Sequence, residues 1–156
     1  MNGSYFQAIW NGLMVLATGL QALLLLAIRL IFGYKFFIAG LGKFGHIASI
    51  VSFFEELGIP LPAWNAYFVS SAECIGGILL ILGLCTRPTA FLLTIIMIVA
   101  FLTAHLNAVK EIFSNPVNFV HEGAFNYLLA SLILFAFGPG KISVDHFLGR
   151  WFFRVK

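Results

Sequence analysis

Charged residues are scarce in this chain of 156 residues, since 10% of it is Asp, Glu, Lys or Arg and 61% is hydrophobic. Soluble globular domains carry about 25% charge, and a domain of this size leaves much of its surface exposed. The mean hydropathy is +1.00. This composition argues against a soluble fold, and we expect lipid to solvate much of the molecule.

Cysteine is also scarce, because the chain has only two, Cys74 and Cys85. If both lie on one helix, their spacing of eleven residues separates the Cα atoms by roughly 16 Å. A disulfide requires Cα atoms within about 7 Å. Neither residue belongs to a CxxC motif. We therefore do not expect a thiol–disulfide enzyme that acts through these two residues.

Basic residues form no run or stripe over the first 140 residues, so the net charge of +3 does not predict nucleic-acid binding. In a membrane protein, excess Lys and Arg more often mark the cytoplasmic side. The segment Met1-Asn2-Gly3-Ser4 lacks the positive charge of a signal peptide, and no small-residue cleavage site follows it. We therefore expect the first hydrophobic segment to be retained.

Long hydrophobic segments are abundant, and each has about the 20 residues that a bilayer crossing requires. They cover residues 20–41, 65–84, 88–109 and 119–137. Pro88 suits the first turn of a helix, and Gly138-Pro139-Gly140 is expected to end the last one. The sequence predicts an all-α fold, a transmembrane four-helix bundle forming a single domain over residues 1–156.

The distribution of Lys and Arg predicts the orientation of this bundle. If both termini are cytoplasmic, the other side holds only Lys43 and Lys110. The cytoplasmic side then holds Arg87, Lys141, Arg150, Arg154 and Lys156. This asymmetry favours cytoplasmic N and C termini.

Three short amphipathic helices are also predicted, at the two ends and in the first loop, where they would lie at the membrane interface. The first carries Tyr5, Phe6, Ile9, Trp10, Leu13 and Met14 on its apolar side. The loop helix has Ile47, Ile50, Val51, Phe54 and Leu57, with Glu55 and Glu56 on its wet side. The last has Phe147, Leu148, Trp151, Phe152 and Val155 opposite Arg150 and Arg154.

Two charges fall near the middle of predicted spans, Arg29 in the first and Glu73 in the second. A charge at the bilayer centre costs from about 2.5 to more than 10 kcal/mol, so such residues should face the bundle interior and find partners. Counted from the span ends, both lie at nearly the same depth, which predicts an Arg29–Glu73 ion pair. The pair would either only hold two helices together or line a site for a polar or redox-active ligand.

Glycines share a face of the first span with its charged residues. Their spacing places Arg29, Gly33, Phe36, Gly40 and Lys43 on one side of the helix. Gly76 and Gly77 follow Glu73 by one turn in the second span. Glycine allows helices to approach closely in membranes, so we interpret these glycines as packing positions.

A second polar group is predicted at the non-cytoplasmic end of the bundle. It comprises Lys43, His46, His105, Asn107, His121, Glu122 and Asn126. This mixture suits a metal, a quinone head group or a small anion, but no pair has a recognised metal spacing such as HExxH, and we predict no metal site. The candidate ligand-binding residues of the whole chain are Arg29, Glu73, Lys43, His105, Glu122 and Asn126.

Several motifs, in order, resemble the DoxX family. Arg29, Gly33, Phe37, Gly40 and Lys43 resemble R…G…F…G..K, and the loop reads Gly58-Ile59-Pro60. The second span, from Glu73 to Arg87, resembles E..GG.LL..GL.TR, and the segment from Gly138 to Asp145 resembles GPG..S.D. The resemblance covers residues 29–145. It implies a four-helix bundle in a prokaryotic cytoplasmic membrane, in the context of quinol oxidases, thiosulfate–quinone oxidoreductases and redox-stress complexes.

The resemblance favours a redox-linked subunit that binds a quinone-like or other small amphipathic ligand, or that supports a partner oxidoreductase. Arg29 would supply a fixed positive charge, Glu73 a proton-exchanging carboxylate, and Lys43 or His105 a hydrogen-bond donor at the mouth. The sequence shows no haem, flavin or Fe–S ligand set. The cofactor stays open, and the family resemblance implies a quinone as one candidate. A carrier or permeation protein, formed with the help of homo-oligomerisation, and a purely structural assembly subunit remain as alternatives, and the chain need not be catalytic.

Overall fold

The computed structural model describes residues 3–152 and shows eight helices in them. They are α1 (Gly3–Gly45), α2 (Ile47–Glu56), α3 (Pro62–Leu82), α4 (Thr86–Thr103), α5 (Leu106–Lys110), α6 (Pro116–His121), α7 (Gly123–Phe137) and α8 (Val144–Phe152). No strand occurs among these residues. The prediction of an all-α membrane protein is confirmed.

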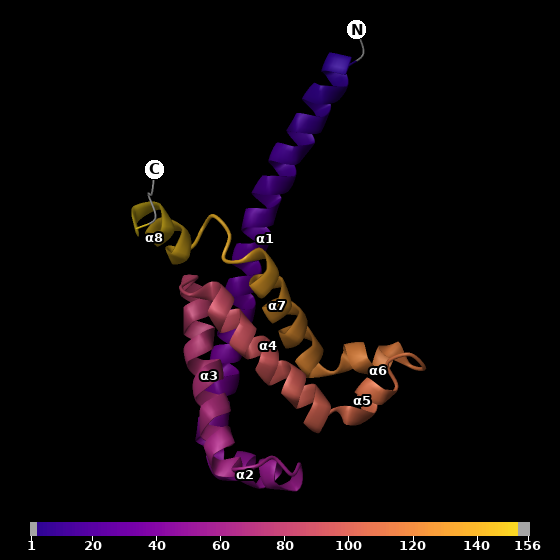
Figure 1. Ribbon diagram of the computed structural model, residues 1–156, viewed down its shortest axis with the longest axis vertical. Helices are drawn as coiled ribbons and strands as arrows, with labels where there is room; N and C mark the ends of the chain where they lie inside the picture. Colours follow the sequence, from indigo (N-terminus) through magenta and orange to yellow (C-terminus); the bar gives the residue numbers. More distant parts are fainter. Residues whose placement is uncertain (1–2, 153–156) are drawn as a thin grey trace.

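Helices α1, α3, α4 and α7 pack together as the body of the molecule (Figure 1). The most extensive contacts join α1 to α3 and α4 to α7, while α3–α4 and α1–α7 contacts are smaller. Three of these helices, α1, α3 and α4, are long and apolar enough to cross a membrane. The fourth, α7, is equally apolar but has only 15 residues.

The two ends of the bundle differ in what covers them (Figure 1). One end, called here the α8 end, holds the α3–α4 turn, the last turn of α7, and α8. The opposite end, called here the α2 end, holds α2, α5 and α6. The first part of α1 extends well beyond the bundle at the α8 end, so the first turns of this helix lie far from every other helix (Figure 1).

The separate N-terminal interfacial helix is a wrong prediction. Helix α1 runs without a break for 43 residues, which corresponds to about 65 Å, roughly twice the thickness of a hydrocarbon core. No proline interrupts residues 3–45, and Gly12 and Gly19 are not sufficient to end the helix. The side chains of Tyr5 and Phe6 lie outside the described part of the chain.

The boundaries of the last two spans also differ from the prediction. Helix α4 ends at Thr103 and the chain turns at His105, so residues 104–109 do not continue it. Helix α7 begins at Gly123 because Glu122 is extended, with φ −62° and ψ 130°. The hydropathy of residues 104–109 and 119–121 resembles that of a span, although these residues belong to the short helices α5 and α6 and their turns.

The other interfacial helices form as predicted over the described residues. Helix α2 carries Glu55 and Glu56 exposed, and Pro62 begins α3 where its missing N–H costs nothing. Helix α8 is formed to Phe152, with Phe147 and Leu148 exposed. The remaining side chains of its predicted faces, namely Arg150, Trp151, Phe152, Arg154 and Val155, lie outside the described part of the structure.

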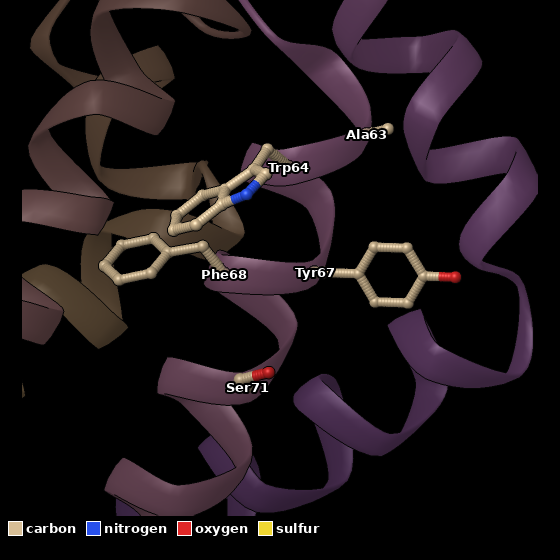
Figure 2. A pocket seen from close by; sticks show the side chains of 5 residues that line it. All are labelled: Ala63, Trp64, Tyr67, Phe68 and Ser71. Carbon is tan, nitrogen blue, oxygen red and sulfur yellow. The ribbon is translucent and has the colours of Figure 1, made fainter.

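Aromatic side chains gather on α3 near the α2 end. The rings of Trp64 and Phe68 stack with centroids 6.3 Å apart, and the Tyr67 ring points in a different direction from theirs (Figure 2). With Ala63 and Ser71 they line a shallow pocket on the outside of the bundle. Trp and Tyr concentrate where a membrane meets water, so this turn of α3 fits the membrane interface.

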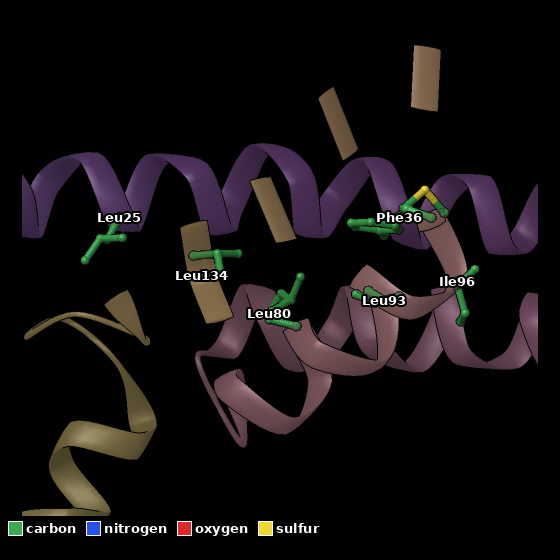
Figure 3. Packing of buried hydrophobic residues seen from close by; sticks show 8 residues of the cluster. Leu25, Phe36, Leu80, Leu93, Ile96 and Leu134 are labelled. Carbon is green, nitrogen blue, oxygen red and sulfur yellow. The ribbon is translucent and has the colours of Figure 1, made fainter. Parts of the chain in front are cut away.

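Buried side chains from all four long helices meet in one core (Figure 3). Its members are Leu25, Phe36, Leu80, Ala90, Leu93, Ile96, Met97 and Leu134. Helix α7 ends at Gly138, as the Gly-Pro-Gly sequence predicts, and Gly138 and Gly140 both have positive φ. Cys74 and Cys85 are free thiols, as expected.

Glycines set the distance between α1 and α3. A Cβ at Gly40 would lie 2.6 Å from the backbone nitrogen of Cys74, and one at Gly77 would lie 2.5 Å from the carbonyl oxygen of Gly33. Backbone atoms cannot rotate away, so only glycine fits at these positions. The predicted packing role of the glycines is confirmed.

Candidate functional site

The interior of the bundle holds an ion pair between α1 and α3. Lys43 donates to both carboxylate oxygens of Glu73. Glu73 is 1% exposed, whereas the side chain of Lys43 is 27% exposed. Helical side chains lean toward the helix N-terminus, so Lys43, near the C-terminal end of α1, reaches back into the bundle.

The predicted Arg29–Glu73 ion pair is wrong. Gly33 lies against Gly77, and Gly40 against Cys74, which fixes the antiparallel register of α1 and α3. In this register Arg29 reaches the level of Gly83, ten residues and about 15 Å along α3 from Glu73. The predicted depth of Arg29 was counted from residue 20, but α1 begins at Gly3, so residue 20 is not an end of this helix.

Arg29 instead lies at the α8 end, where it is 1% exposed. Its Nη2 donates to the carbonyl oxygen of Ile142, and its guanidinium fills the space beside Gly83 that a Cβ would need. The Asp145 carboxylate lies within electrostatic reach of this guanidinium. Among the described residues, Arg29 Nε and Nη1 have no hydrogen-bond partner. Arg29 therefore ties the segment after α7 to α1.

Asp145 completes the closure of the α8 end by capping α4. Its carboxylate accepts hydrogen bonds from the backbone N–H groups of Cys85, at 2.7 Å, and Thr86, at 2.9 Å. Its own N–H donates to the carbonyl oxygen of Gly83 at 2.9 Å. A carboxylate satisfies the free N–H groups of a helix start and complements its dipole. Two sequence motifs about 60 residues apart thus meet at one place.

Tyr127 of α7 lies within electrostatic reach of Glu73. Its ring packs edge-on against Phe36, with centroids 4.8 Å apart, and against Phe32 at 6.0 Å. Tyr127 is not among the residues predicted from the sequence, because an aromatic residue inside a hydrophobic span resembles an ordinary core residue. The pair, this hydroxyl and the two rings together combine proton-exchanging groups with flat apolar surfaces.

The polar group predicted at the α2 end is only partly assembled. His105 Nδ1 and Glu122 Oε2 are 2.8 Å apart, an ion pair when the imidazole is protonated, and each side chain is about one-third exposed. Lys43 belongs to the interior pair instead, and His46 is exposed, with its Nδ1 3.2 Å from the carbonyl oxygen of Gly42. Asn126 is exposed on α7.

A shallow pocket adjoins the His105–Glu122 pair. It is lined by Asn107, Ala108, Glu111, Asn118, His121 and Glu122. Over the described residues, no group of three or more His, Cys, Asp or Glu side chains is placed to hold a metal ion. The α2 end therefore offers carboxylates, imidazoles and amides to solvent rather than a built coordination site.

Comparison with protein families identifies the chain. The family model described as DoxX matches residues 24–106, more than half of the chain. The chain belongs to the DoxX family. The matched segment contains Arg29, Lys43, Glu73 and His105 but ends before Tyr127. Both halves of the interior ion pair therefore lie in the part of the chain that defines it as a DoxX protein.

Three relatives of this DoxX protein cover most of its length. The Bacillus subtilis (strain 168) protein named "Putative oxidoreductase CatD" is 34% identical over 79% of this chain and 85% of its own. An uncharacterized membrane protein of Mycobacterium tuberculosis is 30% identical over 80% of this chain and 81% of its own. An uncharacterized protein of Haemophilus influenzae is 30% identical over 78% of this chain and 80% of its own. No solved structure matches the chain.

Proposed function

We propose that this DoxX protein is a redox-linked membrane subunit whose Lys43–Glu73 pair binds the polar head of a quinone-like molecule. The observation that carries the proposal is the pairing, between α1 and α3, of the buried Glu73 carboxylate with the partly exposed Lys43 ammonium. A buried ion pair adds little net stability compared with well-packed apolar side chains, so stability alone is a weak reason for it. The oxidoreductase named among the relatives supports the redox context.

The groups around the pair suit such a ligand. A quinone carbonyl accepts hydrogen bonds, which the Lys43 ammonium and the Tyr127 hydroxyl can donate. Glu73 would exchange a proton with the ligand, and Phe36 and Phe32 would pack against its ring. In this proposal the electrons come from a partner oxidoreductase, because no redox group is built from the residues described here.

The other candidate residues take secondary roles in this proposal. Arg29 holds a fixed positive charge at the α8 end and keeps the segment after α7 closed. His105 and Glu122 lie at the α2 end, where they would pass protons between water and the interior, and Asn126 is exposed in the first turn of α7. In this proposal, His105 and Glu122 exchange protons with water, whereas Lys43 and Glu73 contact the ligand.

We also propose the location of the protein in a prokaryotic cytoplasmic membrane with both termini cytoplasmic, as a single domain. Arg29, Arg87 and Lys141 lie at the α8 end, whereas Lys43 and Lys110 lie towards the α2 end. The excess of positive charge supports a cytoplasmic α8 end. Under this orientation the His105–Glu122 pair faces the opposite side of the membrane.

A purely structural role is the second candidate, and the packing of the interior favours it. Glu73 is fully enclosed, and α1 and α3 touch through glycines on both sides of it. An ion pair in such a place can hold two helices in register without binding anything. This candidate predicts that the pair affects stability and has no measurable ligand.

Ligand binding in lipid nanodiscs distinguishes the two candidates. The probes are menadione and a short-chain ubiquinone, titrated against the full-length protein and its Glu73→Gln, Lys43→Met and Glu55→Gln variants. Loss of a charge-assisted contact should weaken binding at least about tenfold in the first two. Glu55→Gln is the control, because Glu55 is an exposed carboxylate on α2. This variant should bind both probes as the wild type does. A folded wild-type protein that binds neither probe, with Glu73→Gln only less stable, would support the structural role instead.

A further inference from the structure

Lys35 is a charged residue on the outside of α1. It is exposed, and its Nζ lies 5.5 Å from the centroid of the Phe32 ring. The two ion pairs found among the described residues, Lys43–Glu73 and His105–Glu122, do not include it, and none of the hydrogen bonds there involves its Nζ. Within the described chain, the Lys35 ammonium therefore has this cation–π contact but no hydrogen bond and no ion pair.

The depth of Lys35 places it in the apolar part of the bundle. It follows Gly33 and precedes Gly40, the two positions at which α1 touches α3, so it lies near the level of Gly77. From Gly77, helix α3 continues for about 8 Å in one direction and about 22 Å in the other. A charged side chain that faces lipid at this depth is costly, and such residues usually face a partner or water.

The neighbours of Lys35 on the same face are large, apolar and exposed. Ile31 is 54% exposed and Ile38 is 46% exposed, one turn before and after it. Residues seven apart share a helix face, and this series extends along α1 through Trp10, Ala17, Leu24, Ile31 and Ile38. No helix of the described chain covers this row, which continues from the bundle into the extended N-terminal half (Figure 1).

We propose that this face of α1, centred on Lys35, docks against a helix of a partner membrane protein that carries an Asp or Glu at the depth of Lys35. Charge complementarity identifies the chemistry of the occupant, because a carboxylate would neutralise Lys35 where lipid cannot. Polar contacts between helices add to association in a membrane, and the apolar row supplies the packing surface.

A second copy of the chain does not fit this face. A symmetric pair would bring the two Lys35 ammonium groups together, which is unfavourable in an apolar medium. The chain has six acidic residues, and only Glu73 lies inside the bundle, where it is buried and bonded to Lys43. The other five, Glu55, Glu56, Glu111, Glu122 and Asp145, lie at the two ends of the bundle. No carboxylate of this chain is therefore free at the depth of Lys35, and in this proposal the counter-charge comes from another protein.

Site-directed photocrosslinking in membranes of the source organism tests the proposal. A benzoylphenylalanine at Ile31 should form an adduct with one membrane protein, joined to a spanning segment that contains Asp or Glu. Lys35→Met should lower the yield roughly tenfold, while Lys35→Arg should retain it. The same crosslinker at Ile95, a lipid-facing residue of α4 that is 42% exposed, serves as the control and should not give this adduct.

A charge exchange completes the test. Lys35→Glu should abolish the adduct, and replacing the partner's carboxylate with Lys should restore it. The proposal is overturned if Ile31 reacts only with lipid or with a second copy, or if Lys35→Met leaves the yield unchanged. An adduct with lipid alone would mean that Lys35 extends along the helix to an anionic head group. Thermal unfolding in detergent checks that each variant is folded, and Lys35→Met should be at least as stable as the wild type because the side chain is exposed.

Discussion

The two halves of α1 are both strongly hydrophobic, but they have very different surroundings, and all three charged residues of the helix, Arg29, Lys35 and Lys43, lie in the second half. From Leu25 onward the helix buries Leu25, Arg29, Gly33, Phe36 and Gly40 against the rest of the bundle. Before Leu25, no described side chain is buried, and the helix extends past the α8 end (Figure 1). Hydropathy does not separate the halves, since the whole segment Ile9–Gly45 qualifies as a membrane span.

The halves differ in whether their glycines contact a facing helix, and only the packed half contains charged residues. In the packed half, Gly33 and Gly40 touch the backbone of α3, and Lys43 meets a counter-charge. In the extended half, Gly12 and Gly19 have nothing within 4 Å of where a Cβ would be. The presence of glycine therefore does not by itself indicate packing; the complementary residue on the facing helix does.

The largest effect on stability is expected from Lys43→Met in the packed half. It leaves the enclosed Glu73 carboxylate without its partner, and breaking a buried ion pair in this way costs about 3 to 5 kcal/mol. The free energy of unfolding in detergent, measured at neutral pH, should fall by that amount. Lys43→Met/Glu73→Leu removes both charges and should recover most of the loss. If the double variant is as unstable as the single one, the pair is not the source of the effect.

A smaller effect is expected from Gly40→Ala. The new Cβ would meet the backbone of Cys74 at 2.6 Å and that of Ser70 at 2.8 Å, so α1 and α3 must separate. Overpacking of this kind costs about 1 to 3 kcal/mol. Gly42→Ala, two residues along the same helix with open space around it, is the matched control. Equal unfolding free energies for the two variants would contradict the close approach of these helices.

Arg29→Met should have a still smaller effect on global stability and a clear local effect. The change leaves the Ile142 carbonyl without its donor, which costs about 1 to 3 kcal/mol, but it also removes two buried N–H groups that lack partners. We expect a net loss near the lower limit, about 1 kcal/mol. Trypsin cleavage at the exposed Lys141 should become faster, because the segment after α7 loses its contact with α1. Lys110→Met, at the α2 end, should leave that rate unchanged.

Features that depend on nearby residues could be predicted from the sequence. Helix α2, the end of α7 at Gly138 and the glycine face of α1 all follow from local patterns, and the structure contains each of them. The partner of Glu73 could not be predicted, because it depends on the register between two helices, which hydropathy does not define. Asp145 capping α4 joins residues about 60 positions apart, and only the folded chain brings them together.

The site residues show the same limit. Glu73 stands out in the sequence because a carboxylate inside a hydrophobic span needs an explanation, and its burial agrees with that reasoning. Lys35 and Tyr127 did not stand out in the sequence. Lys35 lies between two other basic residues of the same helix, and Tyr127 resembles an ordinary core residue. Their significance comes from what they face, which is open surface for Lys35 and Glu73 for Tyr127.

The smallest effect is expected from Gly19→Ala in the extended half, and its sign is informative. Nothing lies near this position, so the new methyl meets no clash, and Ala favours a helix over Gly by about 0.5 to 1 kcal/mol. Purified protein should therefore unfold at the same or a slightly higher free energy, in contrast to Gly40→Ala. In native membranes, the effect of Gly19→Ala on the Ile31 crosslink depends on whether a helix of another protein covers this half of α1. A variant that is stable when purified but loses the Ile31 crosslink would show that the extended half is packed in the cell, against the partner rather than against its own bundle.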